Sequence, residues 1–172
     1  MDGVRKGHAF SEQSLQDILD CVDEDIFIHE KAGATSGTDD VSEEYRGTSQ
    51  RVGVHYNMFP DAKRELEEWV GDGTEVKQFD LIVYRKGSRF IRHIDDYTGD
   101  ERRIHSTSTV LYRSDDLVGG DLILYDSRDD DSGTKMNLEV GETLLFSSDR
   151  WHEVTEVTQG VRICLISWLK NS

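Results

Sequence analysis

The stretch Arg92-His93-Ile94-Asp95 decides how the rest of the sequence is interpreted. Residues two apart on a strand point to the same side, so the imidazole of His93 and the carboxylate of Asp95 can reach one cation. Much later in the chain, the pair Trp151-His152 supplies a second imidazole. Two imidazoles and one carboxylate form a facial triad, which leaves coordination positions open and suits non-haem Fe(II).

The residues after His152 strengthen this interpretation. His152 opens an alternating run that ends at Val157, and Gly160 then provides a turn. Arg162 opens a mostly apolar segment over residues 162–168, which predicts a buried strand. An arginine in that position is explained if it binds a carboxylate bidentately in a dry pocket. The alternative is a buried ion pair, which seldom improves stability.

Four other histidines are interpreted as structural or exposed: His8, His29, His55 and His105. Of these, His105 is the rival to His152 because it lies in the half of the chain that is rich in predicted strands. The tenth residue after His105 is Asp115, whereas the tenth residue after His152 is the cation Arg162. We therefore assign His152 as the third ligand.

The second half of the chain consists of short strand-like segments separated by Gly, Asp and Ser turns. Strands are expected at residues 78–86, 89–94, 106–113, 120–125, 134–139, 143–147, 152–157 and 161–169. Eight such strands imply a sandwich or barrel, and a jelly roll (a double-stranded β-helix) is the mainly β fold that we expect. The acidic run at residues 129–131 is predicted to be a solvated hairpin tip.

The first half predicts two helices that back the larger sheet. One is expected at residues 12–22 with Ser11 as its cap, and one at residues 62–70 between Asp61 as its cap and Gly71 as its stop. Strands are expected at 25–29 and 51–56, and residues 1–10 are expected to be partly frayed. Residues 32–50 lack periodicity and are either a solvated loop or a lid over the site. A single domain over residues 1–172 follows, with its jelly-roll core at about 78–170 and the helices and candidate lid within 1–77.

Charge and cysteine usage exclude several classes of protein. The formal net charge of −15 argues against a sequence-independent grip on nucleic acid or on an anionic membrane. Cys21 and Cys164 lie far apart in apolar patterns, which suggests reduced core residues and a cytoplasmic location. We find no signal peptide and no apolar run long enough to cross a membrane.

Residues 78–170 contain an ordered series of short motifs: Tyr84-x-x-Gly87, Arg92-His93-x-Asp95, Gly99-Asp100-x-Arg102, Thr109-Val110-Leu111-Tyr112, Gly119-Gly120-Asp121-Leu122, Gly141-x-x-x-Leu145-Phe146, His152-Glu153-Val154 and Gly160-x-Arg162 followed by Trp168. In these motifs the chain resembles the 2-oxoglutarate/Fe(II) dioxygenases of the prolyl 4-hydroxylase type. The part from Arg92 to Arg102 is most similar to the oxygen-sensing prolyl hydroxylases and their bacterial relatives. The sequence departs from the family at Arg113-Ser114, where Leu-Asn is usual.

The resemblance implies a set of residue roles. His93, Asp95 and His152 would hold Fe(II), and Arg162, Tyr84 and Tyr112 would bind the cosubstrate 2-oxoglutarate. O2 would be the second cosubstrate and ascorbate a reductant. The residues assigned to the substrate side are Tyr45, Arg46, Arg102 and Trp151.

The implied reaction is hydroxylation of a C–H bond in a prolyl residue of a protein or peptide, with release of succinate and CO2, by a monomer or weak homodimer. One alternative is a hydroxylase of a free amino acid or another small molecule. An alternative of a different class is a non-catalytic, cupin-like protein that binds a metal or 2-oxoglutarate. Arg162 and Tyr84 favour a protein that binds 2-oxoglutarate over a cupin-like protein that binds only a metal. The sequence does not separate an enzyme from a non-catalytic sensor of 2-oxoglutarate.

Overall fold

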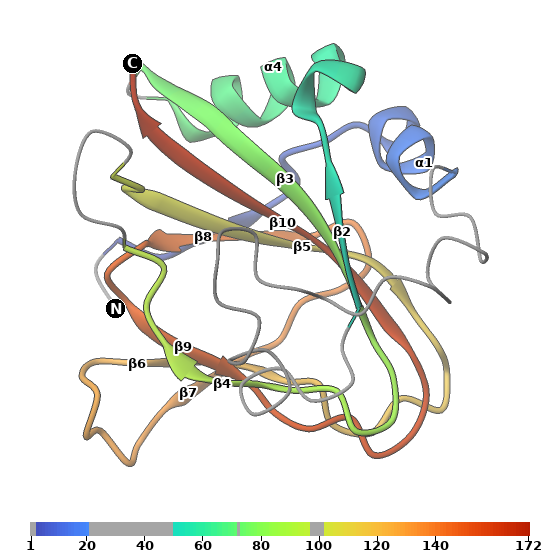
Figure 1. Cartoon of the computed structure of the whole chain (residues 1–172), viewed down its shortest axis with the longest axis vertical. Coiled ribbons are helices and arrows are strands. Elements are labelled where there is room, and N and C mark those ends of the chain that lie inside the picture. The colour runs from blue at the N-terminus through green and yellow to red at the C-terminus, as the bar shows by residue number, and fades with distance from the viewer. Residues whose placement is uncertain (1–2, 21–49, 72, 97–101) are drawn as a thin grey trace.

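The computed structural model describes residues 3–20, 50–71, 73–96 and 102–172, and it contains two antiparallel sheets (Figure 1). The six-stranded sheet has the order β1-β8-β5-β10-β3-β2, and the four-stranded sheet has the order β4-β9-β6-β7. The strands are β1 (Arg5–Gly7), β2 (Gln50–Val54), β3 (Thr74–Tyr84), β4 (Phe90–His93), β5 (His105–Arg113), β6 (Leu122–Tyr125), β7 (Thr134–Met136), β8 (Thr143–Ser147), β9 (Trp151–Val154) and β10 (Arg162–Asn171). From β3 onward the chain passes back and forth between the two sheets, which confirms the mainly β jelly roll expected from the sequence.

Two helices cover the outer face of the six-stranded sheet, as the sequence predicts (Figure 1). They are α1 (Glu12–Asp20) and α4 (Pro60–Val70), and a 3-10 turn, η1 (Tyr56–Met58), precedes α4. Ile18 of α1 and Leu66 of α4 are fully buried in one cluster with Phe79 and Leu165 of the sheet. Each such apolar side chain contributes about 1.5–3 kcal/mol through removal from water.

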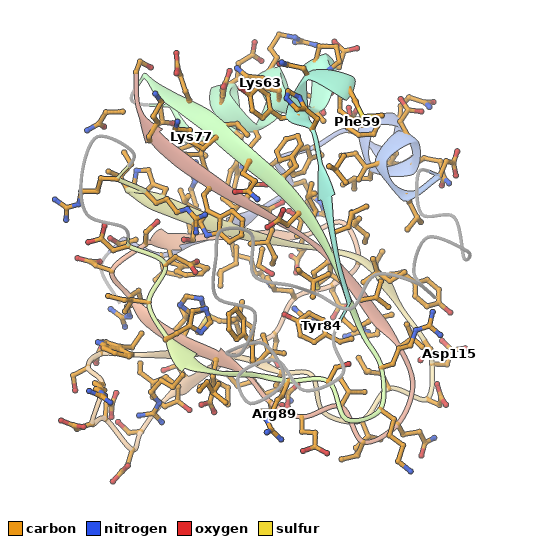
Figure 2. The ribbon with its side chains drawn as sticks, viewed as in Figure 1. Phe59, Lys63, Lys77, Tyr84, Arg89 and Asp115 are labelled. Carbon is orange, nitrogen blue, oxygen red and sulfur yellow. The ribbon has the colours of Figure 1, made fainter. Side chains whose placement is uncertain are left out.

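A second core fills the space between the two sheets, and it forms the environment of the site. Along β3, Phe79 and Leu81 face the helices, whereas Ile82 and Tyr84 face the four-stranded sheet. Both faces of this strand are buried toward its end, where residues 81–84 form a continuous apolar run. Figure 2 shows Tyr84 between the sheets, while Lys63 lies on the helical side of the molecule.

Some element boundaries differ from the prediction for local reasons. α4 begins at Pro60, whose fixed φ suits the first helical position, and Asp61 makes no capping bond to the backbone. β3 begins at Thr74 because Gly71, which has φ +79°, ends the helix and the chain turns directly into the strand. β9 ends at Val154 because the backbone of Val157 bonds instead to residues 87 and 88.

Other predictions are corrected or fall outside the described residues. The short strand β1 was not predicted, since three residues are too few for a recognisable alternation. β2 ends at Val54 and β7 at Met136, both earlier than expected. Ser11 does cap α1, because its hydroxyl accepts a bond from the backbone of Ser14 at 3.2 Å. The strand at 25–29, the segment at 32–49 and residues 21–22 of the first helix lie outside the described residues.

Cys164 is buried and makes no disulfide, as expected, and Cys21 lies outside the described residues. Among the described helices, none is long and apolar enough to cross a membrane.

Candidate metal centre and cosubstrate pocket

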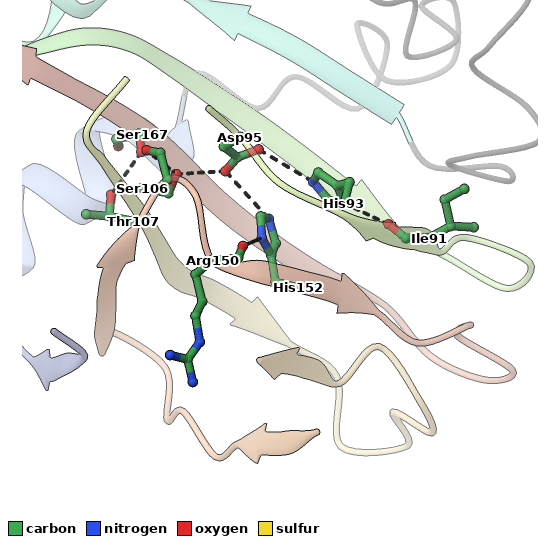
Figure 3. A network of polar contacts seen from close by, with 9 residues as sticks. Ile91, His93, Asp95, Ser106, Thr107, Arg150, His152 and Ser167 are labelled. Atoms are coloured by element: carbon green, nitrogen blue, oxygen red, sulfur yellow. Dashed lines mark hydrogen bonds and ion pairs between the residues drawn. The ribbon is translucent and has the colours of Figure 1, made fainter. Parts of the chain in front are cut away.

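Two histidines and an aspartate converge between the sheets (Figure 3). His93 at the end of β4 is the register partner of His152 on β9, and Asp95 lies two residues after the end of β4. Their candidate ligand atoms all lie within 4.8 Å of one another. The Nε2 atoms of His93 and His152 each lie 3.5 Å from one oxygen of the Asp95 carboxylate. In the described ranges this is the one such group of histidine, cysteine and acidic side chains, and His105 does not belong to it.

The hydrogen bonds of the two imidazoles fix their tautomers. Nδ1 of His93 lies 2.7 Å from the carbonyl oxygen of Ile91, and Nδ1 of His152 lies 2.9 Å from that of Arg150 (Figure 3). A carbonyl oxygen can only accept, so in the neutral imidazole each Nδ1 carries the proton and each Nε2 presents a lone pair. Nε2 of His93 is buried and makes no hydrogen bond. These features fit a bound metal ion, because metal-ligating histidines usually donate their other ring N–H in this way.

The carboxylate of Asp95 is held by neighbours that the sequence did not single out. The hydroxyl of Ser106 donates to Oδ2 of Asp95 at 2.8 Å and lies 3.0 Å from the hydroxyl of Ser148. The backbone N–H of Asp95 donates to the carbonyl of Ser148 at 2.8 Å. The sequence feature that could have indicated these neighbours is the Ser/Thr run at residues 106–109 inside a predicted strand. Buried hydroxyl groups need hydrogen-bond partners.

Electrostatics set the charges of the donors. Burial lowers the pKa of His152 to about 4, so this imidazole is neutral at neutral pH. Burial alone would raise the pKa of Asp95, but the nearby His152 and His93 lower it below its ordinary value, and the carboxylate is ionised. One ionised carboxylate beside imidazole lone pairs is a donor set that suits a divalent cation.

Aromatic rings enclose the imidazoles. The ring centroid of Phe90 lies 3.7 Å from that of His93, and Phe146 meets His152 edge to face with centroids 4.9 Å apart. These contacts limit rotation of the imidazoles and keep water from them.

Arg162, the first residue of β10, brings a buried cation to the same region. Its side chain is 6% exposed, its Nη1 donates to the carbonyl of Gly120 at 3.0 Å, and its guanidinium carbon lies 5.6 Å from the ring centroid of Tyr84. In the part of the chain that the structure describes, no carboxylate pairs with this guanidinium. The buried ion pair that the sequence left open is therefore not formed among these residues.

The triad and Arg162 line one pocket, and the space outside the atoms there, with the adjoining open solvent included, is about 500 Å³. Its walls combine the polar groups with apolar side chains of both sheets: Ile82, Tyr84, Phe90, His93, Asp95, Thr107, Ser108, Leu122, Phe146, His152, Val154, Arg162, Ile166 and Trp168. A mostly apolar cavity with few convergent polar groups is typical of a small-molecule site.

The remaining predicted site residues lie elsewhere. Tyr112 is 45% exposed and does not line the pocket, because the β5–β10 register shifts between Ile163 and Cys164. Trp151 alternates with His152 and is the register partner of Tyr125, so it points away from the pocket.

Arg102 is exposed and pairs with Asp96, with a closest separation of 3.3 Å. Tyr45 and Arg46 lie outside the described residues.

A family model described as the 2OG-Fe(II) oxygenase superfamily matches residues 79–170, which is more than half of the chain. The chain belongs to this superfamily. A PKHD-type hydroxylase of Rhizorhabdus wittichii is 33% identical over 97 residues, which cover 52% of this chain and 41% of that protein. For the first two curated relatives, the matched region covers 39% and 41% of their length, so the chain spans about two fifths of them.

Solved structures share the fold of the whole chain. A prolyl-4-hydroxylase of Pseudomonas putida has a TM-score of 0.66 at 19% identity, with 99% of this chain and 93% of that chain covered. A prolyl hydroxylase of Trichoplax adhaerens, in complex with a hypoxia inducible factor oxygen degradation domain peptide fragment, has a TM-score of 0.71 at 19% identity, with 99% and 84% covered. At such identities the likeness shows the fold alone.

Proposed function

We propose that this chain is a 2-oxoglutarate- and Fe(II)-dependent oxygenase that hydroxylates a C–H bond. The observation that carries the proposal is the buried guanidinium of Arg162, which pairs with no carboxylate of the described residues and lies in the same pocket as the triad of His93, Asp95 and His152. 2-Oxoglutarate has a 2-oxo acid at one end, which can chelate a metal, and a second carboxylate at the other. The pocket offers the triad to the 2-oxo acid and the guanidinium of Arg162 to the far carboxylate.

Each residue then has a defined role. His93, Asp95 and His152 would hold Fe(II), which a triad of this type leaves able to take further ligands such as a 2-oxo acid. When bound, Fe(II) supplies the O2 chemistry by which 2-oxoglutarate, O2 and a C–H bond become succinate, CO2 and an alcohol. Arg162 holds the far carboxylate through two parallel N–H bonds, and the hydroxyl of Tyr84 donates to the cosubstrate. Phe90 and Phe146 exclude water from the imidazoles.

We propose a prolyl residue in a protein or peptide as the substrate. The resemblance of the motif from Arg92 to Arg102 supports this choice, and so does the fold shared with two proteins described as prolyl hydroxylases. Hydroxylation of a free amino acid or another small molecule is the alternative within the same chemistry. A non-catalytic protein that binds a metal and 2-oxoglutarate is the alternative of a different class.

A turnover assay separates these functions. The protein is loaded with Fe(II) and given 2-oxoglutarate, O2 and either proline-containing peptides or free amino acids, and succinate and product mass are read together. We expect succinate and a peptide heavier by one oxygen atom. An oxidised free amino acid would identify the small-molecule hydroxylase. Succinate no higher than in a chelator-treated control, for any substrate, would contradict an oxygenase.

Three further properties belong to the same proposal. A cytoplasmic location is supported by the free, buried thiol of Cys164. Ascorbate would act as a reductant that keeps the iron ferrous, and turnover should then decline faster when it is omitted. A monomer or weak homodimer is expected, and light scattering at two protein concentrations would determine the oligomeric state.

A further inference from the structure

β4, which positions His93, is attached weakly by its backbone. Among the described strands, it lies at the edge of the four-stranded sheet and pairs with β9 alone. Its ladder has register pairs at Phe90 with Val154 and at His93 with His152, and the register shifts between them. The direction of the His93 side chain therefore needs another restraint, since an error of about 1 Å in a site is enough to impair it.

Arg92 provides such a restraint on the opposite face of the strand. Because neighbouring residues on a strand alternate, Arg92 points away from the pocket into which His93 points. Its guanidinium carbon lies 3.4 Å from the ring centroid of Tyr125 on β6, and its Nε lies 3.9 Å from Oε2 of Glu153 on β9. The hydroxyl of Tyr125 in turn donates to Oε1 of Glu153 at 2.9 Å. We call these three side chains the Arg92 clamp.

The clamp also fixes the loop between β6 and β7. Nη1 of Arg92 donates to the carbonyl oxygens of Arg128 and Asp130 at 2.7 and 2.8 Å. One planar guanidinium thus joins β4, β9, β6 and the following loop. A lysine could not reproduce this, because it lacks the flat fork that stacks and donates together.

The clamp lies directly behind the two imidazoles. Arg92 precedes His93 in the chain, and Glu153 follows His152. Tyr125 follows Leu124, which is the register partner of His152. Each clamp residue is therefore adjacent to a ligand or to the partner of a ligand. A movement of β4 against β9 would separate the two Nε2 atoms.

We propose that Arg92 is a positioning residue of the metal centre. It holds β4 against β9 and β6, so that His93 and His152 converge on Asp95 before a metal arrives. This inference rests on the proposed function, because it takes a divalent metal as the ligand of the triad.

Calorimetric titration of the metal-free full chain with Mn(II) tests the inference without requiring turnover. Arg92→Ala should raise the Kd for Mn(II) by about tenfold, the low end of what a lost outer partner of a ligand causes. Arg92→Lys should recover only part of the affinity. Tyr125→Leu should weaken binding in the same direction, because it removes the ring beneath the guanidinium.

Two controls distinguish positioning from general stability. Lys135→Ala removes a 2.8 Å ion pair with Asp121 within the same sheet but leaves β4 untouched, and its Kd should be unchanged. Val70→Ala thins the core beneath α4 and should lower the melting temperature, again with an unchanged Kd for Mn(II).

The outcomes are distinct. A folded Arg92→Ala variant that binds Mn(II) like the wild type would overturn the inference and leave the proposed function standing. If Arg92→Ala does not fold, an unchanged Kd in Arg92→Lys or in Tyr125→Leu overturns it equally. A rise in Kd of the same size in Val70→Ala would attribute the effect to lost stability and overturn it too. Absence of Mn(II) binding by the wild type would overturn both proposals.

Discussion

His93 and His152 each commit their Nδ1 proton to a carbonyl oxygen two residues earlier in the chain. This arrangement leaves two lone pairs beside one ionised carboxylate, and Ser106 fixes that carboxylate from behind. The spacing from His93 to Asp95 made this pair of candidate ligands predictable from sequence, because the period of a strand is local. The contribution of Ser106 was not predictable, because it depends on which strands become neighbours in the fold.

Removal of any triad side chain should abolish metal binding. An open site has no spare ligands, so His93→Ala, Asp95→Ala and His152→Ala should each lose both Mn(II) binding and Fe(II)-dependent turnover while keeping the circular dichroism spectrum of the wild type. His105→Ala is the matched control and should bind Mn(II) normally. Loss of the metal in His105→Ala with retention in His152→Ala would show that the assignment of the third ligand is wrong.

Arg162 should control the affinity for the cosubstrate and not for the metal. Arg162→Ala removes both donors that face a buried carboxylate, a loss of about 2–5 kcal/mol. The apparent KM for 2-oxoglutarate should therefore rise by at least about thirtyfold, with the Kd for Mn(II) retained. Arg162→Lys should recover only part of this loss, because a point charge cannot replace a planar fork. A KM that does not change in Arg162→Ala would exclude Arg162 as the carboxylate ligand.

At the scale of the elements, the periodicity of the sequence predicted that the strands and helices exist, but it did not predict where they end or where the register between strands shifts. β3 ends in an apolar run at residues 81–84, β10 contains one at residues 163–166, and the two helices have apolar residues at helical spacing, so their existence followed from local pattern. Tyr112 was misplaced because a register shift on the neighbouring strand has no signal in its own sequence. The Arg92 clamp joins residues of three strands, and only the tertiary fold reveals it.

The turn that presents the carbonyl of Gly120 to Arg162 should be sensitive to substitution. At Gly119, which has φ +82°, an added Cβ would lie 2.0 Å from the carbonyl oxygen of Glu156, so the turn must move. At Gly71, with φ +79°, an added Cβ would meet no atom within 4 Å, and only backbone strain of about 1–3 kcal/mol is expected. Gly119→Ala should thus lower the melting temperature more than Gly71→Ala, and it should also raise the KM for 2-oxoglutarate. Equal melting temperatures would contradict the described packing of this turn.

At the scale of the whole molecule, the two ends of the pocket belong to different layers. The histidines lie on strands of the four-stranded sheet, whereas Arg162 and Tyr84 lie on β10 and β3 of the six-stranded sheet. The resemblance in sequence indicated both sets of residues, but only the packing of one sheet on the other brings them to a single pocket. A ligand that bridges them should therefore stabilise the domain as a unit.

This bridging predicts a two-step thermal shift. Mn(II) should raise the melting temperature, and 2-oxoglutarate should raise it further only when the metal is present, since a ligand at about 100 times its Kd adds about 2.7 kcal/mol. In Arg162→Ala, the shift caused by the metal should persist and the shift caused by 2-oxoglutarate should disappear. Full stabilisation of that variant by 2-oxoglutarate would place the cosubstrate elsewhere.

The most direct test of oxygenase activity is to follow oxygen atoms during turnover. The Fe(II)-loaded protein is incubated with 2-oxoglutarate under O2 labelled with a heavy oxygen isotope, and the succinate formed is analysed by mass spectrometry. Because one atom of O2 must enter succinate when 2-oxoglutarate is oxidatively decarboxylated, we predict singly labelled succinate from the wild type and none from His152→Ala. If the wild-type protein binds both metal and 2-oxoglutarate but forms no succinate, the 2-oxoglutarate being recovered intact, the protein is a sensor and not an oxygenase.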